Sequence, residues 1–353
     1  MSCKVSRATM IALIAAFATL LAVSVAEAAA LQSVADSIPQ KKDASYDKLV
    51  AAANAVVGVK VKALPNARSN STLGEERVGS GVVIGKDGLV LTIGYLIVEA
   101  DSVTITDTDG SEVPASVIAY DHATGFGLVK PLAPLPLAPR PIKLGTAKPV
   151  NQLDRMMIVT GGEEQNISIA TVVSKREYAC YWEYMIDDAI FTAPARLDHS
   201  GAALINKDGE LVGVGSLFVM DALTPGERLP GNMFVPVDLL KPVLDEMVRT
   251  GGQKAARRPW LGVNSLEEDG RVKVMHVNEE SPADKAGVMP GDIILSVDGE
   301  SVDTLEKFYE KLWRPGAKPG NEVHLTLLHG VGLKEVTVRS IDRRDFMRTK
   351  PTV

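Results

Sequence analysis

One polar loop carries residues that could perform acyl transfer: Asp198, His199 and Ser200, followed by Gly201 and Ala202. A serine hydroxyl attacks a carbonyl carbon from an exposed, tightly turned position, where nearby backbone N–H groups stabilise the developing oxyanion. Small residues after the serine suit this position, because they let a substrate approach the backbone closely. The loop therefore predicts a serine nucleophile, with an ordinary Ser-Gly surface turn as the alternative interpretation.

A serine nucleophile also needs a general base within hydrogen-bond reach, and a third group that orients the base. His199 is adjacent to Ser200, but neighbouring side chains on an extended loop point apart. His122 follows Asp121 in a distant segment and is the second candidate base. The remaining three histidines lie in the C-terminal part of the protein, beyond residue 270.

Short predicted strands precede and follow the serine loop. They are rich in β-branched residues and are separated by turn-forming Gly, Pro, Asn and Asp residues, a pattern typical of β-barrels and β-sandwiches. The expected strands cover 56–62, 79–84, 89–92, two within 102–118, 127–130, 155–162, 167–173, 190–192, two within 204–214, and 233–237, before an amphipathic helix over 238–250.

The stretch from Gly79 to Lys130 contains Gly-Ser-Gly before an apolar run, an Asp-Gly hairpin turn, a Leu-Thr pair and an Asp-x-x-Thr segment. These motifs resemble the first barrel of the HtrA/Deg family of trypsin-like proteases. The Ser200 loop is similar to the family's Gly-Asn-Ser-Gly-Gly-Pro-Leu segment. The resemblance extends from about Val56 to Val338 and implies a mainly β protein with two six-stranded antiparallel trypsin-like barrels.

Three positions depart from the family's motifs. Tyr95 stands where the resemblance implies the general-base histidine, and Gly125 stands where it implies the orienting aspartate. Asp198 stands where the resemblance implies a glycine, whose N–H forms the oxyanion hole together with the N–H of Ser200. Tyrosine with a pKa near 10 is a poor base at neutral pH, and a carboxylate beside the oxyanion would repel it.

These replacements imply a large catalytic loss, because removing triad members costs on the order of 10⁴–10⁶ in turnover. The favoured hypothesis is a pseudoprotease that acts as a chaperone, adaptor or regulator in envelope protein quality control. The alternative is an active serine endopeptidase that uses His122 as a non-standard base.

The C-terminal part contains Ser-Pro-Ala-x-x-Ala-Gly-x-x-Pro-Gly-Asp over 281–292, followed by an apolar strand and an Asp-Gly turn. This string resembles a bacterial HtrA-type PDZ domain. The resemblance implies that the backbone amides of Leu261, Gly262 and Val263 bind the terminal carboxylate of a peptide, which adds to the strand edge by β-augmentation. Apolar side chains of a helix over 304–313 are expected to line the pocket for the last peptide side chain. The alternative is that the PDZ domain only packs against the barrels.

The N-terminus has the organisation of a secretory signal peptide. Lys4 and Arg7 precede an apolar run over 10–25, which ends in Ala26-Glu27-Ala28, a small-x-small cleavage site. The run is short for a membrane span, so cleavage and export are expected, with a retained anchor as the alternative. The mature protein is therefore predicted to be periplasmic or secreted, without a membrane span.

Composition excludes several other classes. Cleavage would remove Cys3 and leave Cys180 as the only cysteine, so no intramolecular disulfide is expected. The formal net charge of −6 is mild and of mixed sign, which argues against nucleic-acid binding. No metal or cofactor is expected, because the histidines are scattered and no phosphate-binding glycine loop precedes a helix.

The predicted organisation of the protein has five parts. They are a signal peptide (1–28), an N-terminal linker or helix (29–54), a double β-barrel (55–248), a linker (249–258) and a PDZ domain (259–345). The predicted partners are unfolded polypeptides or protein C-termini bound through the PDZ domain. The family resemblance also implies a homotrimer assembled through N-terminal segments, although Tyr46 is the only aromatic residue between Leu31 and Lys48.

Overall fold

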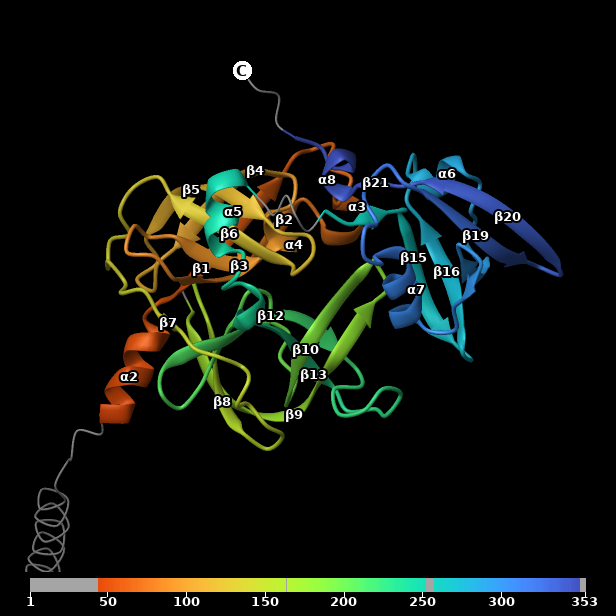
Figure 1. Ribbon diagram of the computed structural model, residues 1–353. Coiled ribbons are helices and arrows are strands. Elements are labelled where there is room, and N and C mark those ends of the chain that lie inside the picture. The colour runs from red at the N-terminus through yellow and green to blue at the C-terminus, as the bar shows by residue number, and fades with distance from the viewer. Residues whose placement is uncertain (1–43, 163, 252–256, 350–353) are drawn as a thin grey trace, which may run out of the picture. The chain divides into compact units, whose positions relative to one another are not determined.

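A computed structural model describes residues 44–349, except 163 and 252–256 (Figure 1). The predicted signal peptide, most of the N-terminal linker and the centre of the second linker lie outside the described residues. The first described element is helix α2 (Ala44–Ala53). None of the helices within the described ranges is long and apolar enough to cross a membrane.

The first barrel is closed and antiparallel, in the strand order β1-β2-β3-β6-β5-β4. Two short helices, α3 (Asn70–Leu73) and α4 (Gly94–Ile97), connect its strands. Strands β1 and β6 have mostly buried residues, as expected of β-branched and apolar runs that face a core. The strands are β1 (Val56–Ala63), β2 (Glu76–Val83), β3 (Val90–Ile93), β4 (Ala100–Thr106), β5 (Glu112–Tyr120) and β6 (Phe126–Pro131).

The second barrel has six antiparallel strands, in the order β11-β8-β9-β10-β13-β12, and a β11–β12 pairing joins the two ends. A seventh strand, β7, pairs with β12 in parallel and was not expected from the sequence. The strands are β7 (Lys143–Leu144), β8 (Arg155–Thr160), β9 (Asn166–Cys180), β10 (Tyr184–Ala193), β11 (Ala203–Ile205), β12 (Glu210–Val219) and β13 (Gly231–Pro236).

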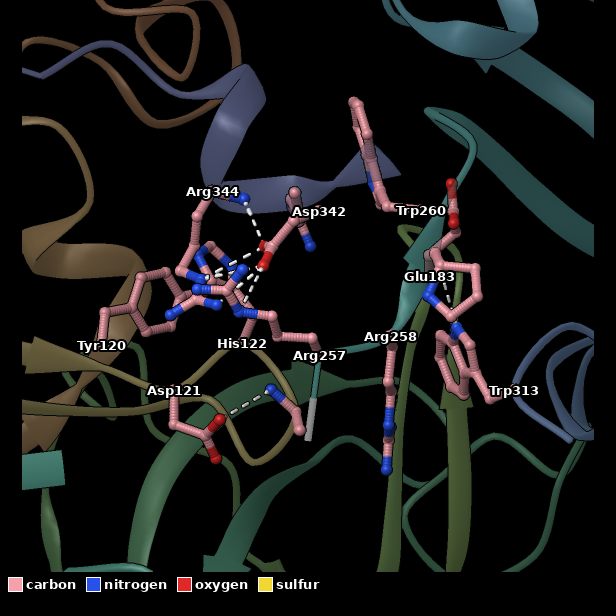
Figure 2. A pocket seen from close by; sticks show the side chains of 13 residues that line it. Tyr120, Asp121, His122, Glu183, Arg257, Arg258, Trp260, Trp313, Asp342 and Arg344 are labelled. Carbon is pink, nitrogen blue, oxygen red and sulfur yellow. Dashed lines mark hydrogen bonds and ion pairs between the residues drawn. The ribbon is translucent and has the colours of Figure 1, made fainter. Parts of the chain in front are cut away.

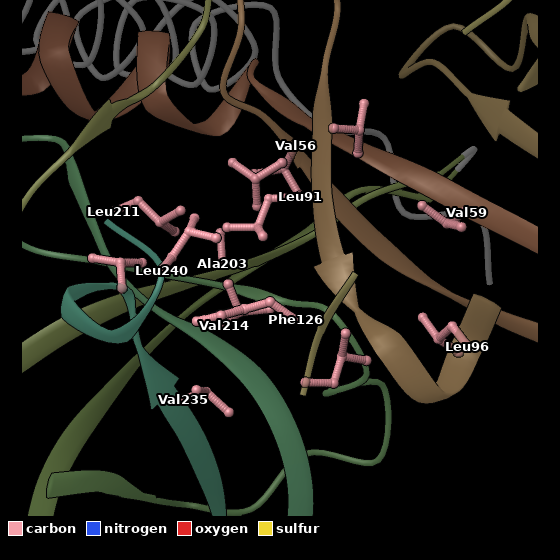
Figure 3. Packing of buried hydrophobic residues seen from close by; sticks show 14 of the residues in the cluster. Val56, Val59, Leu91, Leu96, Phe126, Ala203, Leu211, Val214, Val235 and Leu240 are labelled. Atoms are coloured by element: carbon pink, nitrogen blue, oxygen red, sulfur yellow. The ribbon is translucent and has the colours of Figure 1, made fainter. Parts of the chain in front are cut away.

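One apolar core is shared by both barrels. Leu91 and Phe126 from the first barrel and Val214 and Val235 from the second belong to the same buried cluster (Figure 3). Burial of such side chains contributes roughly 1.5–3 kcal/mol each. The Ser200 loop lies between β10 and β11 and is therefore anchored by this shared core.

The expected helix over 238–250 is wrong in its first half. The backbone forms a short 3-10 turn, η1 (Val237–Leu239), and α5 begins only later (Leu244–Thr250). Pro242 explains the difference, because proline has no N–H for the helix ladder and disfavours helical backbone in the residue before it.

The C-terminal part has the mainly antiparallel sheet and single long helix expected of a PDZ domain. Thr304 caps α7, whose Leu305, Phe308, Tyr309 and Leu312 side chains are buried. The elements are β14 (Pro259–Trp260), β15 (Val263–Glu268), β16 (Arg271–Val277), α6 (Pro282–Lys285), β17 (Ile293–Val297), β18 (Glu300–Ser301), α7 (Leu305–Leu312), β19 (Glu322–His329), β20 (Gly332–Arg339), β21 (Ile341–Asp342) and α8 (Arg343–Phe346).

Candidate active site

The Ser200 loop is held against the first barrel by its own backbone. Ser80 N–H donates to the Ser200 carbonyl at 2.8 Å, and Thr92 Oγ1 donates to the Ser80 carbonyl at 2.7 Å. Gly201 has φ +73°, and a Cβ there would lie 2.0 Å from the Ser80 carbonyl oxygen. Only glycine fits this turn, which presents the Ser200 side chain at the junction of the two barrels.

Tyr95 lies on α4 and reaches the serine directly. Its hydroxyl is 2.8 Å from Ser200 Oγ and 2.8 Å from the Ser216 carbonyl oxygen. The phenol has one hydrogen, and the carbonyl can only accept. The Tyr95 hydroxyl therefore donates to Ser216, and the Ser200 hydroxyl donates to the phenolic oxygen.

The Tyr95–Ser200 hydrogen bond has the length expected between a nucleophile and its base, but the phenol is a poor proton acceptor. Burial raises the pKa of Tyr95 well above its ordinary value. Even at a pKa of 10, only about one phenol in a thousand is ionised at pH 7. A neutral phenol cannot take the serine proton, so Ser200 has a hydrogen-bond partner but no base in Tyr95.

Gly125 leaves no room for a carboxylate behind Tyr95. It has φ +77°, and a Cβ there would lie 2.6 Å from the hydroxyl oxygen of Tyr184. That hydroxyl donates to the Thr124 carbonyl at 2.9 Å. An aspartate at 125 would therefore be strained in its backbone and would collide with Tyr184.

His122 does not face Ser200 in the contacts of the described residues. Its ring packs on Tyr120 with centroids 4.0 Å apart, and Figure 2 shows both rings beside Asp342 and Arg344. Burial, followed by the charge of Arg343, lowers the pKa of His122 to about 3. A histidine of such low basicity in this position argues against the hypothesis that it serves as an alternative base.

The hydrogen bond of His199 goes to the backbone of its own loop and not to the serine hydroxyl. Its Nδ1 is 3.0 Å from the Arg196 carbonyl oxygen, which can only accept, so Nδ1 carries the hydrogen. Burial lowers the pKa of His199. No hydrogen bond within the described part of the protein joins either His122 or His199 to Ser200.

The Asp198 side chain contacts Arg196 and Thr160. Arg196 Nε donates to one carboxylate oxygen at 2.9 Å, and Thr160 Oγ1 approaches the other at 3.4 Å. Burial opposes ionisation of Asp198, but the hydrogen bond and charge of Arg196 outweigh it and lower the pKa. The carboxylate therefore stays ionised, and Arg196 offsets part of the repulsion it would exert on an oxyanion.

A buried arginine that the sequence did not single out holds α4 in place. Arg77 is 4 % exposed and donates to the carbonyls of Tyr95 at 3.1 Å and Val98 at 2.7 Å. It also donates to Ser69 Oγ at 2.8 Å. The position of Tyr95 therefore depends on this guanidinium, whose five donors suit a cluster of backbone carbonyls.

The predicted carboxylate-binding amides already have an acceptor. The N–H groups of Leu261, Gly262 and Val263 donate to the Glu183 carboxylate at 3.0, 2.7 and 3.0 Å. Burial raises the pKa of Glu183 to about 7, while these three amides oppose the rise. Sequence reasoning did not find Glu183, because one acidic residue within Tyr181-Trp182-Glu183-Tyr184 gives no local signal of a ligand.

The site has no arrangement of metal ligands. Within residues 44–349, outside the gaps named above, no three His, Cys, Asp or Glu side chains come together as they do around a bound ion. A cavity of about 270 Å³ lies beside the Tyr95–Ser200 pair and is lined by residues of both barrels and the PDZ part, among them Tyr95, His199, Ser216, Trp260 and Phe346. The geometry thus places the hydrogen-bonded hydroxyls of Tyr95 and Ser200 beside a partly apolar cavity.

Two family models match the protein. Residues 79–214 match the trypsin-like peptidase domain, and residues 259–339 match the PDZ domain. Serine endoprotease DegS of Haemophilus influenzae is 28% identical over 292 residues, covering 78% of this chain and 81% of the relative. A DegP-like protein of Halomonas elongata, described as a probable periplasmic serine endoprotease, is 23% identical, covering 80% of this chain and 60% of its own length.

Solved structures show a similar fold. The HtrA-type protease AlgW with a decapeptide has a TM-score of 0.51 at 20% identity, covering 87% of this chain and 100% of that one. The serine endoprotease from Yersinia pestis has a TM-score of 0.50 at 21% identity, covering 85% and 98%. The protein therefore shares the barrel and PDZ architecture of these structures.

Proposed function

We propose that this chain, a member of the HtrA family of trypsin-like serine proteases that carry a C-terminal PDZ domain, does not cleave peptide bonds. In this proposal the barrels and the PDZ domain bind unfolded polypeptides or protein C-termini. The protein then acts as a chaperone, adaptor or regulator in protein quality control of the cell envelope.

One observation carries the proposal. The residue that contacts the Ser200 hydroxyl is Tyr95, whose phenol is already bound to the Ser216 carbonyl and is not ionised near neutral pH. The absence of a side chain at Gly125 and the low basicity of His122 support the same conclusion. General-base catalysis contributes about 10²–10⁴ to such reactions, and none of these residues supplies it.

The proposed peptide binding and cellular location rest on other parts of the protein. The PDZ domain supports peptide binding, since its first strand edge and loop amides are the groups that receive a C-terminus. We propose a periplasmic or secreted location from the predicted signal peptide over 1–28 and from the relatives described as periplasmic. A homotrimer is also proposed from the family, and a monomer in sedimentation at micromolar concentrations would overturn it.

The first experiment combines fluorophosphonate labelling with degradation of casein, a naturally unfolded substrate. The wild-type protein and Ser200→Ala are expected to label equally little, to leave casein intact and to bind it equally well. The reason is that loss of the base already removes most of the reactivity of Ser200. Labelling and casein cleavage that disappear in Ser200→Ala would instead support an active endopeptidase and require another base.

A further inference from the structure

The tip of the β9–β10 hairpin, residues 181–183, occupies the strand edge and helix that were predicted to receive a peptide. Ser265 N–H on β15 donates to the Tyr181 carbonyl at 2.8 Å. On α7, the Tyr309 hydroxyl donates to the Cys180 carbonyl at 2.5 Å and accepts from Glu183 N–H at 3.0 Å. The tip therefore makes one backbone hydrogen bond to β15 and two hydrogen bonds to the Tyr309 side chain on α7, and it lies where an added peptide strand would lie.

The carboxylate of Glu183 completes this likeness to a bound peptide. It accepts three backbone N–H bonds, from Leu261, Gly262 and Val263, and the residue is 5 % exposed. These are the amides predicted to hold a peptide's terminal carboxylate. Figure 2 shows Glu183 next to Trp260, which begins the same loop. Around the tip, Ala179 and Met185 pack against the core of the PDZ domain.

The backbone conformation of Glu183 is one that few residues other than glycine adopt. Cys180 and Tyr184 are paired, which leaves a three-residue turn whose last residue, Glu183, has φ +56°. Glycine or asparagine is the usual residue at this left-handed position, and other residues cost about 1–3 kcal/mol. Glutamate thus occupies a position whose backbone favours glycine, and its side chain is the only part that glycine lacks.

We propose that Glu183 is an internal ligand of the PDZ domain, bound in the place of a peptide's terminal carboxylate. A partner's C-terminus and Glu183 then exclude each other, because both require the amides of Leu261, Gly262 and Val263. The barrels thereby set the affinity of the PDZ domain for its partner. The inference rests on the proposed function in one respect, namely that the same groove takes protein C-termini.

The test compares peptide binding by the full-length mature protein and its variants. The probes are fluorescent decapeptides of mixed sequence that end in Val, Leu or Phe, each with a free carboxylate, and their amidated twins. Glu183→Gln keeps the size of the side chain and removes its charge, and Glu183→Gly suits the φ of +56° and removes the side chain. Glu177→Gln is the matched control, since Glu177 is an exposed glutamate on the same hairpin.

The expected result is that free-carboxylate peptides bind Glu183→Gln and Glu183→Gly at least about tenfold more tightly than the wild type, because an occupied groove lowers apparent affinity by the fraction that is open. Glu177→Gln should bind like the wild type, and amidated peptides should bind none of the proteins tightly. Equal affinity of the wild type and both Glu183 variants overturns the proposal.

A second measurement separates this inference from the proposed function. The amide proton of Gly262, observed by NMR on labelled protein, is expected to move upfield in Glu183→Gln and to stay in place in Glu177→Gln. If no peptide binds any variant but this resonance moves, the internal contact is supported and peptide binding by the groove is wrong. An unmoved resonance in Glu183→Gln overturns the internal ligand whatever the peptides do.

Discussion

A Tyr95→His variant is expected to react with a fluorophosphonate about 100-fold faster than the wild-type protein. An imidazole has an ordinary pKa near 6.5 and accepts a proton at neutral pH, whereas the buried phenol of Tyr95 does not. The side chain starts from α4, one turn that already directs residue 95 at Ser200. General-base assistance contributes about 10²–10⁴, and the lower end is expected because no carboxylate orients the new histidine.

The measurement is the rate of covalent labelling near neutral pH, with Ser200→Ala in the same background to assign the label. Tyr95→Phe is the matched control, because it removes the hydroxyl without adding a base and should not gain reactivity. An unreactive Tyr95→His would mean that the loop itself is inactive, with Asp198 at the oxyanion position as the next residue to replace. Adding Gly125→Asp to Tyr95→His is not expected to raise the labelling rate further, because Tyr184 occupies the space that the aspartate would need.

An Arg77→Met variant is expected to lower the free energy of unfolding by about 3 kcal/mol. The guanidinium donates to the carbonyls of Gly74, Tyr95 and Val98, and all three would lose a partner in a buried setting. An unsatisfied buried polar group costs about 1–3 kcal/mol, and removal of one partner from a buried charged network costs about 3–5 kcal/mol.

Urea denaturation followed by tryptophan fluorescence measures this effect, with the first transition compared between variants. Arg228→Met is the control, because Arg228 lies exposed in the loop before β13 and surface substitutions usually change stability by about 0.5 kcal/mol or less. Equal stability of the two variants would show that the carbonyls of α4 find other partners. Loss of the Tyr95 position in Arg77→Met should also alter the environment of Ser200.

Much of the fold follows from local pattern. Alternating β-branched residues and Asp-Gly or Gly-rich turns account for the strands of the first barrel, and the Ser-Pro-Ala-x-x-Ala-Gly string accounts for α6 and the PDZ domain. The helix expected over 238–250 was wrong where Pro242 interrupts it, a signal present in the sequence itself. The parallel strand β7 was not predictable, because two residues carry no periodicity.

For the candidate site, residue type alone gives the ordinary pKa of the Tyr95 phenol, near 10, and the lack of a carboxylate at Gly125. Both could be read from the sequence before the fold was known. Which hydrogen bond the Tyr95 phenol makes is a different matter. It depends on the Ser216 carbonyl, 121 residues away, and on burial that only the packed barrels produce.

Glu183 shows most clearly what local sequence pattern cannot predict. In the sequence it is one acidic residue in an aromatic turn, and nothing near it indicates a ligand. Its contacts with Leu261, Gly262 and Val263 join residues 78 to 80 positions apart, across two separately recognisable domains. Local propensity describes each domain by itself, but the packing of one domain against the other decides which carboxylate meets which amides, because that contact exists only after both have folded.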